Sequence, residues 1–450
     1  MRLAIIGGDA AGMSAASAAK RRDPGIEVIA FERGPYTSYS ACGIPYFVGG
    51  LFDDADRLVS RSPEEHRAAG IDVRLRSEVR AIDLGRRVLT VYERSEQRET
   101  EEGFDEVVIA TGAYAGAPPI PGAEATETAR TLDAGERFRA GLERGGGKAV
   151  VIGAGYIGLE MAENLVDRGM AVTVVDQGDQ VMRTLDRDMA AHVQDGAEAH
   201  GVRFLLSTDI EEIVLDGAGR PCRVRTSVGE LPVDHVTLGT GAKPDVRLAK
   251  DAGLQIGETG ALRVDDHQRC PGADGVYAAG DCVESHHRVL DAPVNVQLGT
   301  HANKQGRIAG VNAAGGDARF PGVVGTAVSK VCKYEVARTG ITEAEAEQAG
   351  IECVSAIIKH STRATYYPGA GPIWVKIVAD PGSGRVLGGQ IVGVEGAAKR
   401  IDVLAACIWT GVAVDELSLM DLSYAPPYSP VYDPLLVAGR AAAREIEKRS

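Results

Sequence analysis

Apolar runs that end in a glycine or an acidic residue recur along the chain. Residues 3–6 are apolar and lead into a pair of glycines, and residues 28–32 form a second apolar run that closes on an acid. Between them, residues 11–21 are rich in alanine and run into a basic cluster, a composition that favours a helix. The pattern predicts a strand, a helix and a second strand at the start of the chain.

The same pattern returns in the middle of the sequence. Residues 148–153 form an apolar run that ends in glycine, about 145 residues after the first such run. Similar runs at 105–112 and 236–241 end in glycine turns, and the run at 276–281 ends in an acid. The Pro/Gly-rich stretch 113–122 separates the two units as a linker. This spacing predicts two α/β nucleotide-binding units, an internal repeat of architecture.

From about residue 321 the pattern changes. Alternating apolar and polar positions, as in residues 373–378, are followed by helical stretches. This predicts a separate C-terminal α+β domain.

Two glycine-rich turns carry the first functional signal. Residues 7–12 read GGDAAG after a strand, and Glu32 follows Gly12 by twenty residues; residues 153–158 read GAGYIG, and Asp176 follows Gly158 by eighteen. In dinucleotide-binding folds such a turn places the pyrophosphate at a helix N-terminus, and the later acid accepts from a ribose 2′-hydroxyl. Because Asp176 would repel a 2′-phosphate and Gln177 supplies no cation, the second turn favours NADH over NADPH.

Composition excludes several classes of function. The formal net charge is −14, with 49 basic and 63 acidic residues, so no nucleic-acid partner is expected. No apolar run reaches the roughly 18 residues that a membrane span needs. The seven cysteines are scattered and none has CxxC spacing. That argues against a disulfide scaffold and against a metal site, and it predicts a cytoplasmic protein.

Cys42 is the candidate reactive group. It lies in the stretch SYSACGIPY at residues 38–46, and no second cysteine stands five residues away on either side. It must therefore act as a lone thiolate, a sulfenic acid or a mixed disulfide.

The order of the two glycine turns, the Ala110-Thr111-Gly112 turn and the run 276–281 resemble the flavin-dependent pyridine nucleotide–disulfide oxidoreductases over essentially the whole chain. The resemblance implies an α/β fold with two Rossmann-like, glutathione-reductase-like domains and an α+β dimerisation domain. It implies FAD binding by residues 1–112 and 243–320, NAD(P)H binding by 113–242, and dimerisation by 321–450. The residues implied for FAD are Gly7, Gly8, Ala10, Ala11, Gly12, Glu32, Arg33, Ser40, Ala110, Thr111, Gly112, Gly280 and Asp281. Those implied for NAD(P)H are Gly153, Gly155, Tyr156, Ile157, Gly158, Asp176 and, near the contact of flavin and nicotinamide, Glu160.

The lone Cys42 places the chain beside the single-cysteine members, which are NADH oxidases, NADH peroxidases, coenzyme A-disulfide reductases and coenzyme A-persulfide reductases. Ala10 stands where the peroxidases carry a histidine, which counts against peroxidase chemistry. The Tyr-Pro-Gly stretch after Tyr366 and the Tyr-Ala-Pro-Pro stretch at Tyr424 are similar to those of coenzyme A-disulfide reductases. That similarity implies a homodimer in which both tyrosines reach the partner's Cys42 as catalytic residues. The alternative is that they are interface aromatics.

Four residues are implied for substrate binding: Lys20, Arg22, Ser38 and Asn303. The two cations would bind CoA phosphates, although basic residues also stabilise a helix C-terminus without a ligand. Ala41 replaces the asparagine that often precedes the cysteine in the reductases, which leaves the identity of the thiol open.

These observations predict a reductase that passes electrons from NAD(P)H through FAD to Cys42. Its substrate would be CoA disulfide or a similar small disulfide, with CoA held on Cys42 as a mixed disulfide. Two alternatives stay open. One is an NADH oxidase that works through a Cys42 sulfenic acid, and the other is a CoA persulfide or polysulfide reductase. Some reductases of the latter kind carry an extra C-terminal domain, for which this sequence leaves no room.

Overall fold

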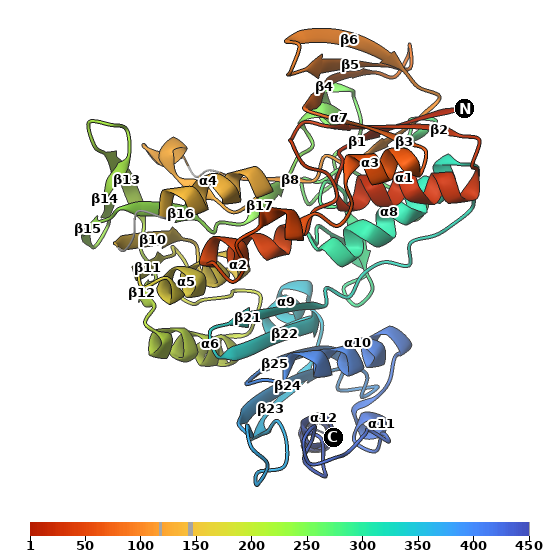
Figure 1. Ribbon diagram of the computed structural model, residues 1–450. Coiled ribbons are helices and arrows are strands. Elements are labelled where there is room, and N and C mark those ends of the chain that lie inside the picture. Colours follow the sequence, from red (N-terminus) through yellow and green to blue (C-terminus); the bar gives the residue numbers. More distant parts are fainter. Residues whose placement is uncertain (117–118, 143–146, 450) are drawn as a thin grey trace.

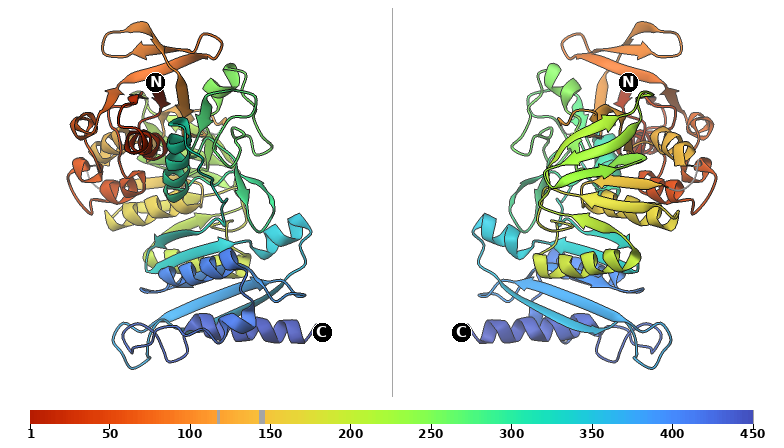
Figure 2. Two further views of the ribbon diagram at one scale, coloured as in Figure 1. Left: turned by 90° about the vertical axis from the view of Figure 1, so that its right-hand side faces the viewer. Right: turned by 90° about the vertical axis from the view of Figure 1, so that its left-hand side faces the viewer.

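The computed structural model describes residues 1–116, 119–142 and 147–449, so residues 117 and 118 of the linker lie outside the described part. The chain forms three domains: the first two lie beside each other in the upper part of the molecule, and the C-terminal domain lies below them (Figures 1 and 2). Two are built on parallel sheets and the third on an antiparallel sheet. This is the predicted α/β architecture with a C-terminal dimerisation domain.

The first parallel sheet has the order β18-β7-β1-β2-β3. Its strands are β1 (Arg2–Ile6), β2 (Glu27–Glu32), β3 (Ile71–Leu75), β7 (Glu106–Ile109) and β18 (Val276–Ala278). Helices α1 (Ala10–Arg22) and α8 (Gly299–Ala313) pack against each other. A Cβ atom placed on Gly306 or Gly310 of α8 would lie 2.1 Å from the carbonyl oxygen of Ala11 or Ala15, so only glycine permits this approach.

Smaller elements surround this sheet. They are α2 (Ile44–Gly49), α3 (Pro63–Ala68), β4 (Ser77–Asp83), β5 (Val88–Glu93), β6 (Arg98–Gly103), β8 (Ala113–Ala115), β17 (Ala242–Pro244), α7 (Arg247–Asp251), β19 (Ser285–His287) and β20 (Ala292–Val294).

The second parallel sheet has the order β12-β11-β10-β16-β9. Its strands are β9 (Glu127–Thr128), β10 (Lys148–Ile152), β11 (Ala171–Val175), β12 (Arg203–Leu205) and β16 (His235–Leu238). The helices of this domain are α4 (Leu132–Leu142), α5 (Tyr156–Asp167) and α6 (Arg187–His200), and its antiparallel sheet contains β13 (Ile210–Leu215), β14 (Pro221–Thr226) and β15 (Gly229–Pro232). The chain enters and leaves this domain through the paired strands β8 and β17.

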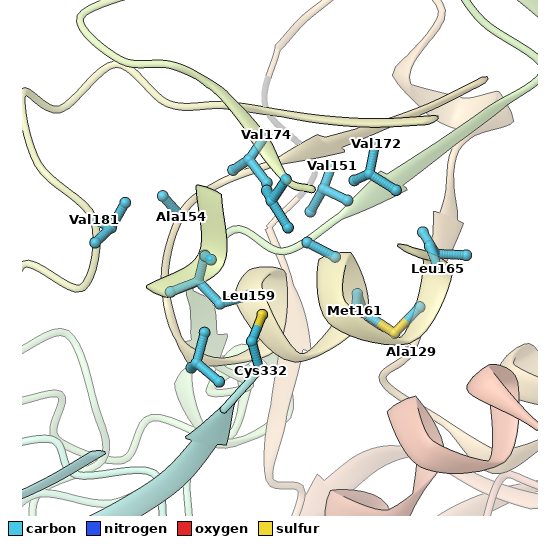
Figure 3. Close-up of a cluster of buried hydrophobic side chains, with 14 of the residues drawn as sticks. Ala129, Val151, Ala154, Leu159, Met161, Leu165, Val172, Val174, Val181 and Cys332 are labelled. Atoms are coloured by element: carbon cyan, nitrogen blue, oxygen red, sulfur yellow. The ribbon is translucent and has the colours of Figure 1, made fainter. Parts of the chain in front are cut away.

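The C-terminal domain is an antiparallel sheet of order β21-β22-β25-β24-β23. The strands are β21 (Ala327–Val331), β22 (Tyr334–Gly340), β23 (Val354–Ser361), β24 (Pro372–Ala379) and β25 (Val386–Gly393), and the helices are α9 (Glu343–Ala349), α10 (Ile401–Thr410), α11 (Val414–Leu417) and α12 (Pro434–Glu447). Cys332, between β21 and β22, points toward Leu159 and Met161 of α5 (Figure 3). This contact packs the C-terminal domain onto the second nucleotide domain.

Among the described residues, no helix combines the length and the apolar character that crossing a membrane would require.

Candidate functional site

The first glycine turn is closed by contacts that exclude any side chain. Gly7 has a φ of +110°, and a Cβ atom on it would lie 2.1 Å from the carbonyl oxygen of Ala110. A Cβ atom on Gly12 would lie 1.9 Å from the carbonyl oxygen of Gly7. The strand, the turn and α1 are therefore in backbone contact, which brings the N-terminus of α1 to the sheet edge. This is the cradle that a dinucleotide pyrophosphate requires.

The second turn resembles the first at its first and last glycines. Gly153 has a φ of +104°, and a Cβ atom on Gly158 would again lie 1.9 Å from the carbonyl oxygen of the first glycine. Gly155 has nothing within 4 Å of its Cβ position, so this face of the turn is open. Tyr156 begins α5 half-buried, and Ile157 is exposed beside it. The residues present therefore fit a second dinucleotide.

The acids after each turn are held in the same way. Glu32 accepts from the backbone N–H of Gly8 at 2.8 Å and of Gly34 at 2.7 Å. Asp176 accepts from the N–H groups of Ala154 and Gly178, both at 2.7 Å. Each carboxylate is thus fixed at the end of its strand, where the ribose of a bound dinucleotide belongs.

Asp9 occupies the place in the first turn that Gly155 occupies in the second. Its carboxylate accepts from the N–H of Tyr39 at 3.2 Å. Burial and then the nearby Glu32 raise the pKa of Asp9 to about 7. This residue links the first turn to the loop that carries Cys42.

The raised pKa of Asp9 predicts a pH-dependent stability. An aspartate in the unfolded chain titrates near 3.9, so between that pH and about 7 the folded chain binds a proton that the unfolded chain lacks. Stability of the flavin-free protein should therefore fall as pH rises through this window. Asp9→Asn should remove the dependence and stabilise the protein at pH 8 by an amount on the order of 2–4 kcal/mol. Thermal unfolding from pH 4 to 8 tests this, with the exposed Asp251→Asn as control; parallel curves for wild type and Asp9→Asn would contradict it.

Asp281 follows β18, an edge strand of the first parallel sheet, and its charge acts on Asp9 of the first turn. Arg130 donates to Asp281 at 2.9 Å and also donates to the carbonyl oxygen of Ala113 at 3.2 Å. Gly280, with a φ of +90°, donates its N–H to the buried Gln305 at 2.9 Å. Asp281 and Gly280 belong to a sequence motif, whereas nothing in the sequence marks Arg130, because its partner lies 151 positions away.

A cavity of about 420 Å³ opens beside Glu32 and Arg33. Arg33 forms an ion pair with Asp245 at 3.6 Å, and the hydroxyl of Thr111 donates to the carbonyl oxygen of Asp245 at 2.6 Å. The cavity continues the first turn along the sheet edge, as the adenosine half of a bound dinucleotide would.

Cys42 lies in a 3-10 turn, Ala41–Gly43, directly before α2. It is exposed, and among the described residues no cysteine forms a disulfide. The loop is fixed beneath it: Ser40 donates its N–H to the carbonyl oxygen of Leu58 at 2.8 Å. A Cβ atom on Gly43 would lie 2.2 Å from a methyl carbon of Leu58, so the Leu58 side chain packs closely against this turn.

Glu160, on α5 of the second nucleotide domain, faces the cysteine. Its carboxylate accepts from the hydroxyl of Ser329 at 2.7 Å, and burial raises its pKa. Although the residue is exposed, desolvation of its sulfur by the surrounding chain, followed by the negative charge of Glu160, raises the pKa of Cys42. The thiolate is therefore disfavoured in the isolated chain and must gain stabilisation from what binds there.

Glu160→Gln removes one cause of the raised pKa of Cys42. We expect the rate of Cys42 alkylation by iodoacetamide, followed by peptide mass spectrometry, to rise at lower pH in Glu160→Gln than in the wild type. The exposed Glu347→Gln should leave the profile unchanged. Superimposable profiles for all three proteins would show that Glu160 does not act on the thiol.

The two candidate tyrosines adjoin one another but not Cys42 of their own chain. Tyr366 is 75% exposed and Tyr424 48% exposed. Slight desolvation and a hydrogen bond to Tyr424 raise the pKa of Tyr366. Both belong to loops at the tip of the C-terminal domain, at the end of the molecule away from α2 (Figures 1 and 2).

The structure gives each predicted substrate residue a protein partner. Lys20 donates to the carbonyl oxygens of Pro24 and Ile26, at 3.0 and 2.8 Å, and Arg22 donates to those of Ala314 and Gly315, at 3.2 and 3.1 Å. Asn303 accepts from Ser14 at 2.8 Å. Lys20 thus bonds backbone just after α1 and Arg22 bonds backbone at the end of α8, and the role of both cations toward a substrate stays a prediction. Ser38, which contacts His66, is the substrate candidate nearest in sequence to Cys42.

Two family models match this chain. Residues 1–306 match "Pyridine nucleotide-disulphide oxidoreductase" and residues 326–434 match the dimerisation domain of the same family. The chain belongs to the pyridine nucleotide-disulphide oxidoreductases. This family implies FAD and NAD(P)H as cofactors, and membership confirms the predicted resemblance and the enzyme class of NAD(P)H-dependent flavoprotein reductase.

Three relatives are similar to this chain over almost its whole length. The chain is 39% identical to the "NAD(P)H sulfur oxidoreductase (CoA-dependent)" of Pyrococcus abyssi, over 97% of both chains. It is 36% identical to the "NADH oxidase" of Methanocaldococcus jannaschii, over the whole of both chains. It is 30% identical to the "Coenzyme A disulfide reductase" of Staphylococcus aureus, over 98% of this chain and 99% of that protein. Among solved structures, a "NAD-Dependent Persulfide Reductase from A. fulgidus" matches with a TM-score of 0.94 and 40% identity, over 99% of this chain and 84% of that one.

Proposed function

We propose that this oxidoreductase reduces CoA-linked sulfur, as a CoA disulfide or a CoA persulfide, through FAD and Cys42. The observation that carries the proposal is the position of Cys42, the one exposed cysteine of the described residues: it lies in the loop after the first glycine turn, where the charge of Glu160, on the helix that follows the second turn, acts on it. The names of the relatives support both CoA and sulfur as substrate chemistry. An additional C-terminal domain does not decide between disulfide and persulfide as substrate, because a relative that matches over 97% of its own length is named a sulfur oxidoreductase.

Two separate sets of residues would hold the two cofactors. The turn at 7–12, Glu32 and the Asp281–Arg130 pair would hold FAD, and the turn at 153–158 with Asp176 would hold NAD(P)H. Bound FAD supplies the two electrons from NAD(P)H that return an oxidised Cys42 to the thiolate.

Cys42 performs the sulfur chemistry. Its thiolate attacks one sulfur of the substrate disulfide, a new S–S bond forms, the old one breaks, and one thiolate leaves. With a CoA persulfide, attack on the sulfur attached to carbon gives the same mixed disulfide and releases hydrosulfide. Delivery of two electrons and a proton then frees the second thiol and regenerates the Cys42 thiolate.

The departing thiolate requires a proton donor, and we propose Tyr366 and Tyr424 of a second copy. Within one chain the loops that carry both tyrosines lie away from α2 (Figure 1), and they belong to the part that matches the family's dimerisation domain. A phenol, with an ordinary pKa of about 10, can hydrogen-bond and protonate a thiolate of similar basicity. The active unit would then be a homodimer with two shared sites.

A heterodimer tests this sharing. Cys42→Ser and Tyr424→Phe chains are mixed, and in the heterodimer one of two shared sites keeps both wild-type residues. We expect Tyr424→Phe alone to lose about 10- to 100-fold in disulfide reduction, and the heterodimer to recover close to half of wild-type activity. No recovery above the mean of the two parent proteins would assign the tyrosines to packing at an interface.

The substrate is tested by mass spectrometry and turnover together. The purified, non-reduced chain is denatured, which removes FAD, and is weighed before and after treatment with a thiol reductant. A loss of about one CoA mass that maps to Cys42, with NAD(P)H-dependent reduction of CoA disulfide or persulfide, supports the proposal. An unmodified or singly oxygenated Cys42, with rapid oxygen consumption on NADH alone, would favour the NADH oxidase instead, the name of the 36% identical relative.

Arg183 makes binding of NADPH more favourable than Asp176 alone would predict. A Cβ atom on Gly178 would lie 3.1 Å from Cδ and 3.2 Å from Nε of Arg183, so this side chain crosses the turn after Asp176. Arg187 pairs with Asp179, but Arg183 has no ion pair in the described part of the chain. A guanidinium at this turn can bind a 2′-phosphate.

We therefore expect Arg183→Ala to lower kcat/KM for NADPH about 5- to 20-fold and to leave that for NADH within twofold. Arg187→Ala, whose guanidinium is already paired, should change the ratio of the two little. Steady-state kinetics with both nucleotides measures this. An equal change for NADH and NADPH would remove Arg183 from the 2′-phosphate site.

A further inference from the structure

His66 connects α3 to the loop that carries Cys42. His66 is buried, with only 2% of its surface exposed. The ring Nε2 lies 2.9 Å from the hydroxyl oxygen of Ser38, four positions before Cys42. The other ring nitrogen, Nδ1, is buried with no hydrogen-bond partner among the described residues.

Ser38 is held in a conformation that non-glycine residues rarely adopt. Its φ is +50°. Its N–H donates to the carbonyl oxygen of Gly8 at 3.1 Å, and its carbonyl oxygen accepts from Ser60 at 2.8 Å. Contacts on both sides therefore impose this backbone, and such imposed conformations concentrate at functional sites. With the backbone fixed, His66 decides where the Ser38 hydroxyl points.

The burial of Nδ1 selects the tautomer. A buried N–H without a partner is rarer in proteins than an unsatisfied acceptor, so the proton belongs on Nε2. Burial, and then the charge of Arg61, lower the pKa of His66, which keeps the ring neutral at pH 7. Nε2–H then donates to the Ser38 oxygen, and the Ser38 proton is free to be donated outward, on the partly exposed side of the loop.

We propose that His66 is a positioning residue that directs the Ser38 hydroxyl to an acceptor on the substrate's thiol arm, such as an amide carbonyl. This inference rests on the proposed function, in which a CoA-linked substrate reaches Cys42. His66 itself touches no reacting atom, so it acts on substrate binding and not on sulfur exchange.

The test compares KM with kcat in three His66 variants. His66→Phe fills the same space without an N–H, and we expect it to raise KM for the CoA substrate about 5- to 10-fold while kcat and KM for NAD(P)H change less than twofold. His66→Gln places an amide N–H where Nε2 was and should restore most of the lost affinity. His66→Asn, whose amide is too short to reach Ser38, should not restore the affinity. If His66→Phe does not fold, His66→Asn serves as the variant without the N–H in its place.

A double-mutant cycle shows whether His66 acts through Ser38. In a Ser38→Ala background the His66 substitution should have no further effect on KM. Additive effects, an unchanged KM, or no rescue by glutamine would each overturn the inference. A wild-type enzyme that reduces neither CoA disulfide nor CoA persulfide would instead overturn the proposed function, so the two failures are distinct.

Discussion

Cys42→Ser should reduce the turnover of CoA disulfide or CoA persulfide by at least about 1,000-fold. A serine hydroxyl is not ionised near neutral pH and cannot form a disulfide, so no mixed disulfide can be made. The glycine turns do not involve the Cys42 side chain, since their contacts are to backbone, Glu32 and Asp176. FAD binding and the reduction of a small artificial electron acceptor by NAD(P)H should therefore survive.

The matched control is Cys353→Ser, which removes a partly exposed free cysteine from the C-terminal domain and should leave turnover unchanged. Steady-state rates, flavin absorbance and oxygen consumption are measured on all three proteins. Undiminished sulfur reduction by Cys42→Ser would refute the role of the thiol. Loss of rapid oxygen consumption in this variant, from a wild type that does not reduce CoA substrates, would assign Cys42 to oxidase chemistry.

The sequence predicted those parts of the fold that depend on local pattern. The run at 3–6 and the run at 148–153 each became the central strand of a parallel sheet, and both glycine turns lie at strand ends. Glycine at these positions is a local requirement: positive φ at Gly7 and Gly153 is readable from the motif alone. The acids Glu32 and Asp176 were predicted from their spacing after the turns. In the structure each accepts from an equivalent pair of backbone N–H groups, one in the turn and one two residues after the acid.

The residues that sequence reasoning missed act across long separations. Arg130 meets Asp281 151 positions away, and His66 meets Ser38 across 28 positions. Neither arginine nor histidine carries a local pattern that marks such a partner, so only the fold could show the contact. The basic cluster at the end of α1 shows the converse: its local pattern suggested phosphate ligands, but only the fold shows that Lys20 donates to the carbonyl oxygens of Pro24 and Ile26. Its role toward a substrate stays a prediction.

Lys376 joins the C-terminal domain to the second nucleotide domain through a cluster of charges. Its side chain is 2% exposed, on β24 of the C-terminal domain, and its Nζ lies 3.1 Å from Asp186 and 2.9 Å from Asp188 at the start of α6. Glu343 is a third carboxylate partner, and Gln390 donates to Asp186 at 2.6 Å. Although burial opposes the charge of Lys376, hydrogen bonds to Glu343 and Asp188 outweigh it and raise the pKa. A raised lysine pKa means that this stabilisation is fully present at neutral pH and is lost only above the ordinary lysine pKa.

Lys376→Met should therefore destabilise the protein by about 3–5 kcal/mol, because it leaves the buried Asp186 and its neighbours without their cation. We expect the thermal midpoint of the FAD-bound enzyme to fall by roughly 3–5 °C at pH 7. Since the cost is that of unpaired carboxylates, the difference from wild type should shrink as pH falls and these groups protonate. Lys399→Met, which breaks an exposed pair with Asp402, should change the midpoint by no more than about 1 °C. Equal midpoints for Lys376→Met and wild type would show that the two domains are joined mainly by the apolar contact around Cys332 and α5, and not by this charge cluster.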